Sequence, residues 1–305
     1  MTTLLYSRRA VALGAATWCL SAGAAAQGPI DGYLKARGET TLALSASATG
    51  ADRFIGGDGA TAFDFPFRGQ LVGLYASYGL TDGLDLVASV PYVITETTAG
   101  LQDAALFAKG LLRRFPLGDV AHGARTLDVL GALGVSYPLS DYEVVAAGAI
   151  GQRAQVVQPR LVAQYNQPGF FASGIAGYNY RFDELDRERL AAIQRVRPGY
   201  RPDQPSDFLN FLLRAGVPTA RLYADAWLEV QRTLGGSDFV PDVEELPQPY
   251  DVDYQQVGGT LYYSETGRWG FSVSGATFLG GRNTSRLWRV TAGAVLNLPA
   301  GRANR

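Results

Sequence analysis

The chain has 305 residues, with 27 Lys and Arg against 28 Asp and Glu, so its formal net charge is −1. This balance offers no basic surface for nucleic acid, and we expect no nucleic-acid partner. One Cys and one His are too few for a Cys/His zinc site or for a haem-attachment Cys pair. The length suits one large β domain or two small ones.

The first 26 residues have the pattern of a secretory signal peptide. Arg8 and Arg9 form a basic start, an apolar run covers 10–20, and residues 24–26 are all Ala. We therefore exclude 1–26 from the mature fold and expect export. The mature chain carries 25 basic and 28 acidic residues, a formal charge of −3. It is predicted to begin with a short periplasmic segment at 27–38.

The mature chain is patterned as strands rather than as membrane-spanning helices. No apolar run after residue 26 approaches the roughly 20 residues that cross a bilayer as a helix. Apolar and polar residues alternate with a period of two, and turn residues interrupt them regularly. The alternation predicts about twelve strands, an even number as in bacterial outer-membrane barrels. They lie at 39–50, 69–79, 84–96, 102–114, 126–138, 153–166, 169–182, 207–216, 220–234, 253–264, 268–279 and 285–298.

The predicted connections alternate in length. Short ones lie at 80–83, 167–168, 217–219 and 265–267, and long ones lie at 51–68, 139–152, 183–206 and 235–252. Short turns on one side and long loops on the other are typical of a barrel inserted from the periplasm. We therefore predict an all-β fold: a transmembrane antiparallel β-barrel over 39–298, with short periplasmic turns, long extracellular loops and a C-terminal tail at 299–305.

Each strand has one apolar face, which assigns the inside and the outside of the barrel. In 220–234 the even-numbered residues from Leu222 to Val230 are apolar, whereas the odd-numbered ones are mostly polar or charged. In a membrane barrel the apolar face contacts lipid and the polar face lines the lumen. The candidates for lumen-lining residues are Lys109, Arg160, Arg181, Arg214, Asp225, Trp227, Glu229 and Arg289.

The last strand has the pattern that closes an outer-membrane barrel. A polar residue at Thr291 and a glycine at Gly293 precede alternating apolar residues at Leu296 and Leu298. We predict that this strand pairs with the first one. The aromatic residue expected at the extreme C-terminus is missing, because 299–305 follow Leu298.

A family resemblance points to the same fold. The stretch 78–86, with sequence YGLTDGLDL, is followed by Ser-Val-Pro-Tyr at 89–92 and by Leu-Gln-Asp-Ala-Ala-Leu at 101–106 with Lys109. These residues resemble the outer-membrane barrel family labelled "MetA-pathway of phenol degradation". The resemblance is strongest over 70–115, and it implies an outer-membrane barrel that acts as a transporter.

Two functions fit a twelve-stranded barrel, whose lumen is expected to be narrow. The first is a porin-like channel for passive passage of a small solute, amphipathic or aromatic, oriented by lumen walls of opposite charge. The second is a barrel closed by salt bridges, with the loops 183–206 and 235–252 binding a surface partner. Outer-membrane lipid and the barrel-assembly machinery are expected partners in both. A third alternative, a secreted soluble β-protein, requires the Leu222 to Val230 face to pack against a second sheet.

Enzymatic and metal sites find little support. The single His122 lies between Ala and Gly in a predicted periplasmic turn, which is a poor place for a general base. The acidic residues in 238–253 do not have the spacing of an EF-hand calcium loop. Separately, residues 183–196 are predicted to form a helix, which is a candidate lid over the barrel mouth. We expect no enzyme activity, no metal site and no cofactor.

Overall fold

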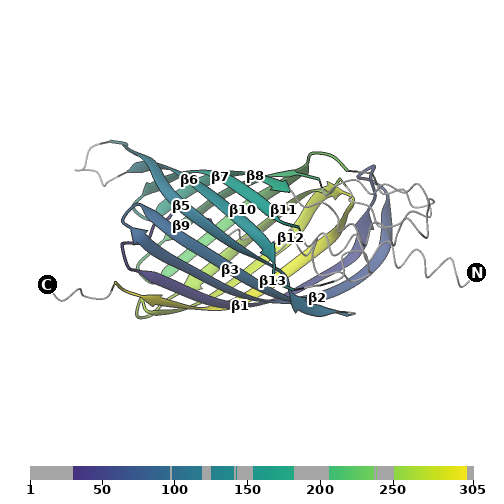
Figure 1. The fold of residues 1–305 in the computed structure, drawn as a ribbon, viewed down its shortest axis with the longest axis horizontal. Coiled ribbons are helices and arrows are strands. Elements are labelled where there is room, and N and C mark those ends of the chain that lie inside the picture. Colours follow the sequence, from purple (N-terminus) through teal and green to yellow (C-terminus); the bar gives the residue numbers. More distant parts are fainter. Residues whose placement is uncertain are drawn as a thin grey trace, which may run out of the picture.

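The computed structural model describes residues 30–96, 98–118, 125–140, 142, 154–181, 206–236, 238 and 251–300. Tilted strands close into one barrel (Figure 1). The strands are β1 (Thr40–Ile55), β2 (Ala62–Thr81), β3 (Leu84–Thr95), β4 (Ala99–Leu101), β5 (Asp103–Pro116), β6 (Thr126–Pro138), β7 (Val156–Gln167), β8 (Phe170–Arg181), β9 (Phe208–Pro218), β10 (Leu222–Thr233), β11 (Asp253–Tyr263), β12 (Trp269–Arg282) and β13 (Thr284–Leu298).

The barrel has twelve strands because β4 and β5 form one strand. Both pair antiparallel with β3, and they are separated only by Gln102, whose backbone N–H donates to the Pro91 carbonyl at 2.9 Å. All neighbouring strands pair antiparallel, and β13 pairs with both β12 and β1. The last strand therefore closes the sheet, with Thr291 opposite Ser47 and Leu298 opposite Thr40. The predicted fold class and strand number are confirmed.

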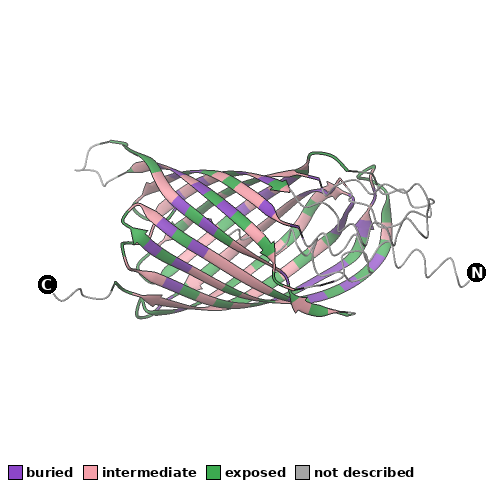
Figure 2. Ribbon diagram, viewed as in Figure 1, coloured by how far each residue is buried: buried purple, intermediate pink, exposed green. Residues whose placement is uncertain are grey.

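The outer surface is apolar, as expected of a barrel surrounded by lipid. Buried and exposed residues alternate along the strands (Figure 2). Large apolar side chains that are 50% or more exposed occur on strands all around the barrel. They include Leu44, Leu74, Leu106, Leu133, Leu161, Leu213, Leu261, Phe271, Val273 and Val290. In water this surface would be costly, at roughly 25 cal/mol per Å² of apolar area, whereas lipid accepts it.

The face from Leu222 to Val230 packs against no second sheet. Leu222 is 46% exposed, and β10 pairs only with β9 and β11 in the single described sheet. The soluble alternative required that packing. No helix in the described ranges is both long and apolar enough to cross a membrane.

The connection between β1 and β2 is shorter than predicted. The loop expected at 51–68 is only 56–61, because both strands continue beyond the bulge at Ala51. Phe54, Phe65 and Phe67 are buried inside this extension, and their rings pack against one another. The bulge interrupts the period-two alternation at residues 51–53, which hid the extension from the sequence pattern.

The β1–β2 turn is organised by one carboxylate. Asp58 accepts hydrogen bonds from the backbone N–H of Ala60 at 3.0 Å and of Thr61 at 2.8 Å, and from the Thr61 hydroxyl. These donors favour the ionised form, and they lower the pKa of Asp58 below its ordinary value.

Aromatic rings inside the barrel lie over glycines of neighbouring strands. A Cβ atom at Gly134 would lie 2.2 Å from the Phe107 ring, and one at Gly258 would lie 2.2 Å from the Trp227 ring. Gly258 is also confined from the other side, since the same atom would lie 2.4 Å from the Gly275 carbonyl oxygen. The inward-facing rings therefore occupy space that a side chain at either glycine would fill.

We predict that Gly258→Val destabilises the barrel by about 1–3 kcal/mol, the usual cost of overpacking. The Trp227 ring is buried, and the Gly275 backbone is held by its pairing with β13. Gly280→Ala on the adjacent β12 is the control, because nothing lies within 4 Å of a Cβ atom there. The measurement is the temperature at which each variant loses its heat-modifiable migration in detergent gels. Equal temperatures for the two variants would refute the packing argument.

Candidate functional site

The N-terminal segment lies inside the barrel. Residues 27–38 are predicted as a periplasmic segment, but the described part from Ile30 to Arg37 instead enters the lumen. The entry is fixed by Gly38, whose N–H donates to the Gly79 carbonyl at 2.7 Å and whose φ is 83°. Further inside, Ile30 is only 1% exposed and packs in a cluster of inward-facing residues. We call residues 30–37 the plug segment.

A buried ion cluster holds the plug segment. Lys109 on β5 and Asp85 on β3 are register partners, and they are 2% and 0% exposed, respectively. The Lys109 Nζ donates to Asp31 Oδ1 at 2.8 Å and to the Tyr33 carbonyl, and it lies 3.4 Å from Asp85 Oδ2. Asp85 also accepts the Lys35 N–H at 3.1 Å. The buried Lys109 of β5 therefore links Asp85 of β3 to Asp31 of the plug segment.

Apolar contacts hold the plug segment against one wall. Ile30 belongs to a buried cluster with residues of β3 and of β5 to β10, and Leu34 packs against its edge. The Tyr33 ring meets Phe171 edge-on at 5.7 Å, and Phe171 stacks on Tyr223 at 5.4 Å. The barrel members of the cluster are Val87, Phe107, Leu130, Ala132, Val162, Ile175, Leu212 and Trp227.

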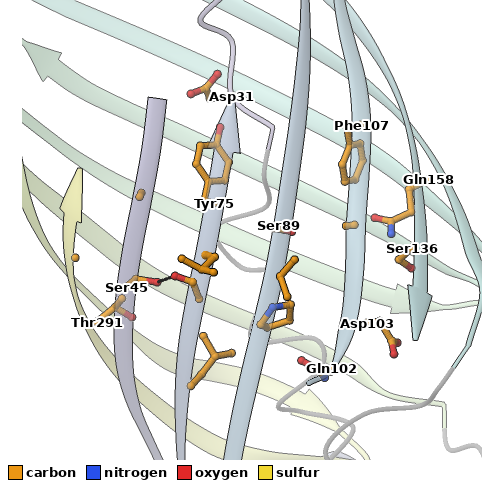
Figure 3. Close-up of a pocket in the computed structure, with 18 of the residues that line it drawn as sticks. Asp31, Ser45, Tyr75, Ser89, Gln102, Asp103, Phe107, Ser136, Gln158 and Thr291 are labelled. Carbon is orange, nitrogen blue, oxygen red and sulfur yellow. Dashed lines mark hydrogen bonds between the residues drawn. The ribbon is translucent and has the colours of Figure 1, made fainter. Parts of the chain in front are cut away.

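The opposite wall leaves a cavity of about 700 Å³ beside the plug segment. This wall comes from β1, β2, β12 and β13, whose lining residues are mostly small. Ser45 and Thr291 lie on one side of the cavity, and Phe107 and Gln158 lie on the other (Figure 3). The lining extends along the barrel from Thr41 and Asn297 to Arg181 and Thr233. The further small residues of this wall are Ala43, Gly73, Ser272 and Gly293.

The predicted lumen residues divide into two groups in the structure. Arg160, Arg181, Arg214 and Asp225 line the cavity. Lys109 is buried under the plug segment. Trp227 and Glu229 are each 3% exposed, and Arg289 interacts electrostatically with Glu229. These predicted residues lie at inward positions. The sequence pattern did not identify Asp31 and Tyr33 of the plug segment, which also line the cavity.

The arginines that line the cavity contact both carboxylates and aromatic rings. Arg214 Nε lies 3.2 Å from Asp225 Oδ2, which also accepts the Tyr223 hydroxyl at 2.7 Å. Arg160 lies over the Phe107 ring at 5.2 Å, and Arg181 lies over the Phe208 ring at 4.9 Å. Arg181 also interacts electrostatically with Asp207 and Asp103, so opposite charges interact in both parts of the lumen.

Comparison with known proteins identifies the fold. No protein-family model and no curated protein matches the sequence. Among solved structures, the chain is similar to the COG4313 outer membrane channel from Pseudomonas putida F1, at TM-score 0.64 and 14% identity, over 88% of this chain and 99% of that one. The chain has the fold of an outer-membrane channel.

Two porins are more distant in structure. The KdgM porin in complex with disordered oligogalacturonate has a TM-score of 0.47 and 8% identity, over 83% of this chain and 98% of that one. The NanC porin has a TM-score of 0.44 and 9% identity, over 84% of this chain and 100% of that one.

Several predicted features lie outside the described residues. They are the signal peptide at 1–26, His122, the helix at 183–196, most of the loops at 183–206 and 235–252, and the tail beyond residue 300. Within the described ranges, no group of three or more His, Cys, Asp or Glu side chains is placed to hold a metal ion.

Proposed function

We propose that the protein is a narrow outer-membrane channel for passive passage of a small amphipathic solute, and that it belongs to the "MetA-pathway of phenol degradation" family that its sequence resembles. One observation carries the proposal: a cavity of about 700 Å³ lies between the plug segment and the wall of small residues. A core packed only for stability would have filled this space, because protein interiors contain few voids larger than a water molecule.

The chemistry of the lining supports an amphipathic solute. The lining combines the hydroxyl groups of Ser45, Ser272 and Thr291 with aromatic and aliphatic side chains such as Phe107 and Phe208. The volume of about 700 Å³ lies within the range of pockets for small ligands. A solute with one polar and one apolar side therefore fits this lining better than a fully hydrated ion does.

Planar-bilayer recording of the purified mature protein tests the channel. We expect discrete conductance steps, reduced when Ser45→Phe places a ring in the cavity. Ala46→Phe is the matched control, since residue 46 is the next one along β1 and faces outward. Inserted protein without conductance would contradict the proposal and favour the closed barrel, with the loops 183–206 and 235–252 as partner-binding elements. Equal effects of the two substitutions would remove this cavity from the conduction path.

A further inference from the structure

We propose that Glu229 is a charge-selectivity residue of the lumen: it interacts with Arg160 and Arg289 from opposite walls of the barrel and offsets their positive charge. The inference rests on the proposed channel function and deepens it, because it names the group that sets the preference between anions and cations.

The two arginines lie on opposite sides of the barrel. Arg160 is on β7 and Arg289 is on β13. In one direction around the closed sheet, β8 to β12 separate these two strands. In the other direction, β1, β2, β3, the combined β4 and β5, and β6 separate them. Glu229 is on β10, midway along the first of these paths. The three charges therefore come from widely separated parts of the wall.

Glu229 is a buried carboxylate that acts on both guanidinium groups. Arg160 and Arg289 each interact electrostatically with it. Two hydrogen bonds from β11 hold the carboxylate in place: the Gln256 amide donates to Oε2 at 2.7 Å, and the Tyr254 hydroxyl donates to Oε1 at 3.2 Å. Glu229 is 3% exposed, and salt screens a buried charge much less than an exposed one. The two arginines thus share one fixed anion.

Arg160 brings this charge network to the cavity. Its Nη2 donates to Gln158 Oε1 at 2.9 Å, and its guanidinium lies over the Phe107 ring of β5 at 5.2 Å. Gly177 on the neighbouring strand leaves room for the side chain, because a Cβ atom there would lie 3.4 Å from Arg160 Cγ. Arg160 is one of the residues that line the cavity. A solute in the cavity therefore passes a cation whose charge Glu229 partly offsets.

The charges lie just beyond the apolar cluster around Ile30. Trp227 and Val162 belong to that cluster. Glu229 and Arg160 are the next inward-facing positions on the same two strands, roughly 7 Å farther from the entry of the plug segment. A solute that enters from the end of the barrel with the long loops meets these charges before it reaches Ile30.

Positive and negative groups are equal in number in this part of the lumen. Two arginines share Glu229, and the third, Arg181, interacts with Asp103 and Asp207. Three cations therefore face three anions. Neutralising Glu229 leaves one positive charge in excess, whereas neutralising Arg289 leaves one negative charge in excess. Charged side chains that line a pore determine which ions pass, so the two changes should have opposite effects.

Reversal potentials of the purified mature protein in a planar bilayer, recorded under a salt gradient, test the inference. We expect Glu229→Gln to shift the permeability ratio toward anions by about two- to fivefold, the effect of one uncompensated charge near the path. Arg289→Gln should shift the ratio toward cations. The double variant should return close to the wild-type ratio, because it removes one charge of each sign. Glu265→Gln is the matched control, since it makes the same chemical change on a side chain that is 61% exposed outside the lumen.

The outcomes separate the selectivity residue from the channel. A folded, conducting Glu229→Gln variant with the wild-type ratio overturns the inference and leaves the channel standing. A shift in the same direction for Glu229→Gln and Arg289→Gln also overturns it, because a general distortion of the lumen would then explain both. Inserted wild-type protein without current overturns the channel and the inference together. If Glu229→Gln loses the heat-modifiable barrel, Arg289→Gln decides: an unchanged ratio, or a shift toward anions, overturns the inference.

Discussion

Replacing residues 30–36 with a Gly/Ser segment of equal length is expected to raise single-channel conductance several-fold. The plug segment lies in the lumen from Gly38 to Ile30, and its apolar side chains pack against the barrel wall opposite the cavity. Glycine and serine cannot form the ion cluster with Lys109 or the apolar contacts with the barrel. The replacement should therefore leave the segment mobile and widen the path for ions. The measurement is conductance in a planar bilayer, at several salt concentrations.

The control for this replacement is Glu265→Ser with Thr266→Ser, which also introduces serine but does so in an exposed turn outside the lumen. Heat-modifiable migration verifies that both variants keep the barrel. Unchanged conductance in a folded plug variant would mean that the segment does not limit the pore. The current would then be set by the wall of small residues alone.

The strands were predictable because the pattern that identifies each strand lies within its own residues. A period of two with one apolar face needs only neighbouring residues, so β10 and β13 were placed within a few residues of their ends. The same alternation identified the inward positions of Arg160 and Glu229. The bulge in β1 was missed because a bulge breaks the alternation without ending the strand.

The plug segment was unpredictable for a different reason. Its residues have no repeating period, and its partners come from distant positions: Asp85 is 50 residues from Lys35, and Lys109 is 78 residues from Asp31. One signal was available in the sequence. Ile30, Tyr33 and Leu34 are large and apolar in a stretch expected to be solvated. Lys109 was selected as a lumen residue, but nothing local showed that its partner lay ahead of the first strand.

The ion cluster makes Lys109→Met the substitution with the largest expected effect on stability. Removing the cation leaves Asp85, which is 0% exposed, without its charged partner in the barrel interior. Breaking a buried ion pair from one side costs about 3–5 kcal/mol, because the remaining charge is buried and uncompensated. The free energy of unfolding, measured by denaturant titration of the barrel in lipid vesicles, should fall by this amount. Lys109→Met with Asp85→Asn should recover part of the loss, since the double variant removes both charges.

An exposed ion pair gives the matched control. Arg221 and Glu265 lie 3.4 Å apart and are 65% and 61% exposed, so Arg221→Met should change the free energy of unfolding by less than about 1 kcal/mol. If Lys109→Met behaves like Arg221→Met, the cluster does not anchor the plug segment. If it destabilises the barrel and the second substitution restores nothing, the loss comes from packing of the Lys109 stem rather than from the uncompensated charge of Asp85.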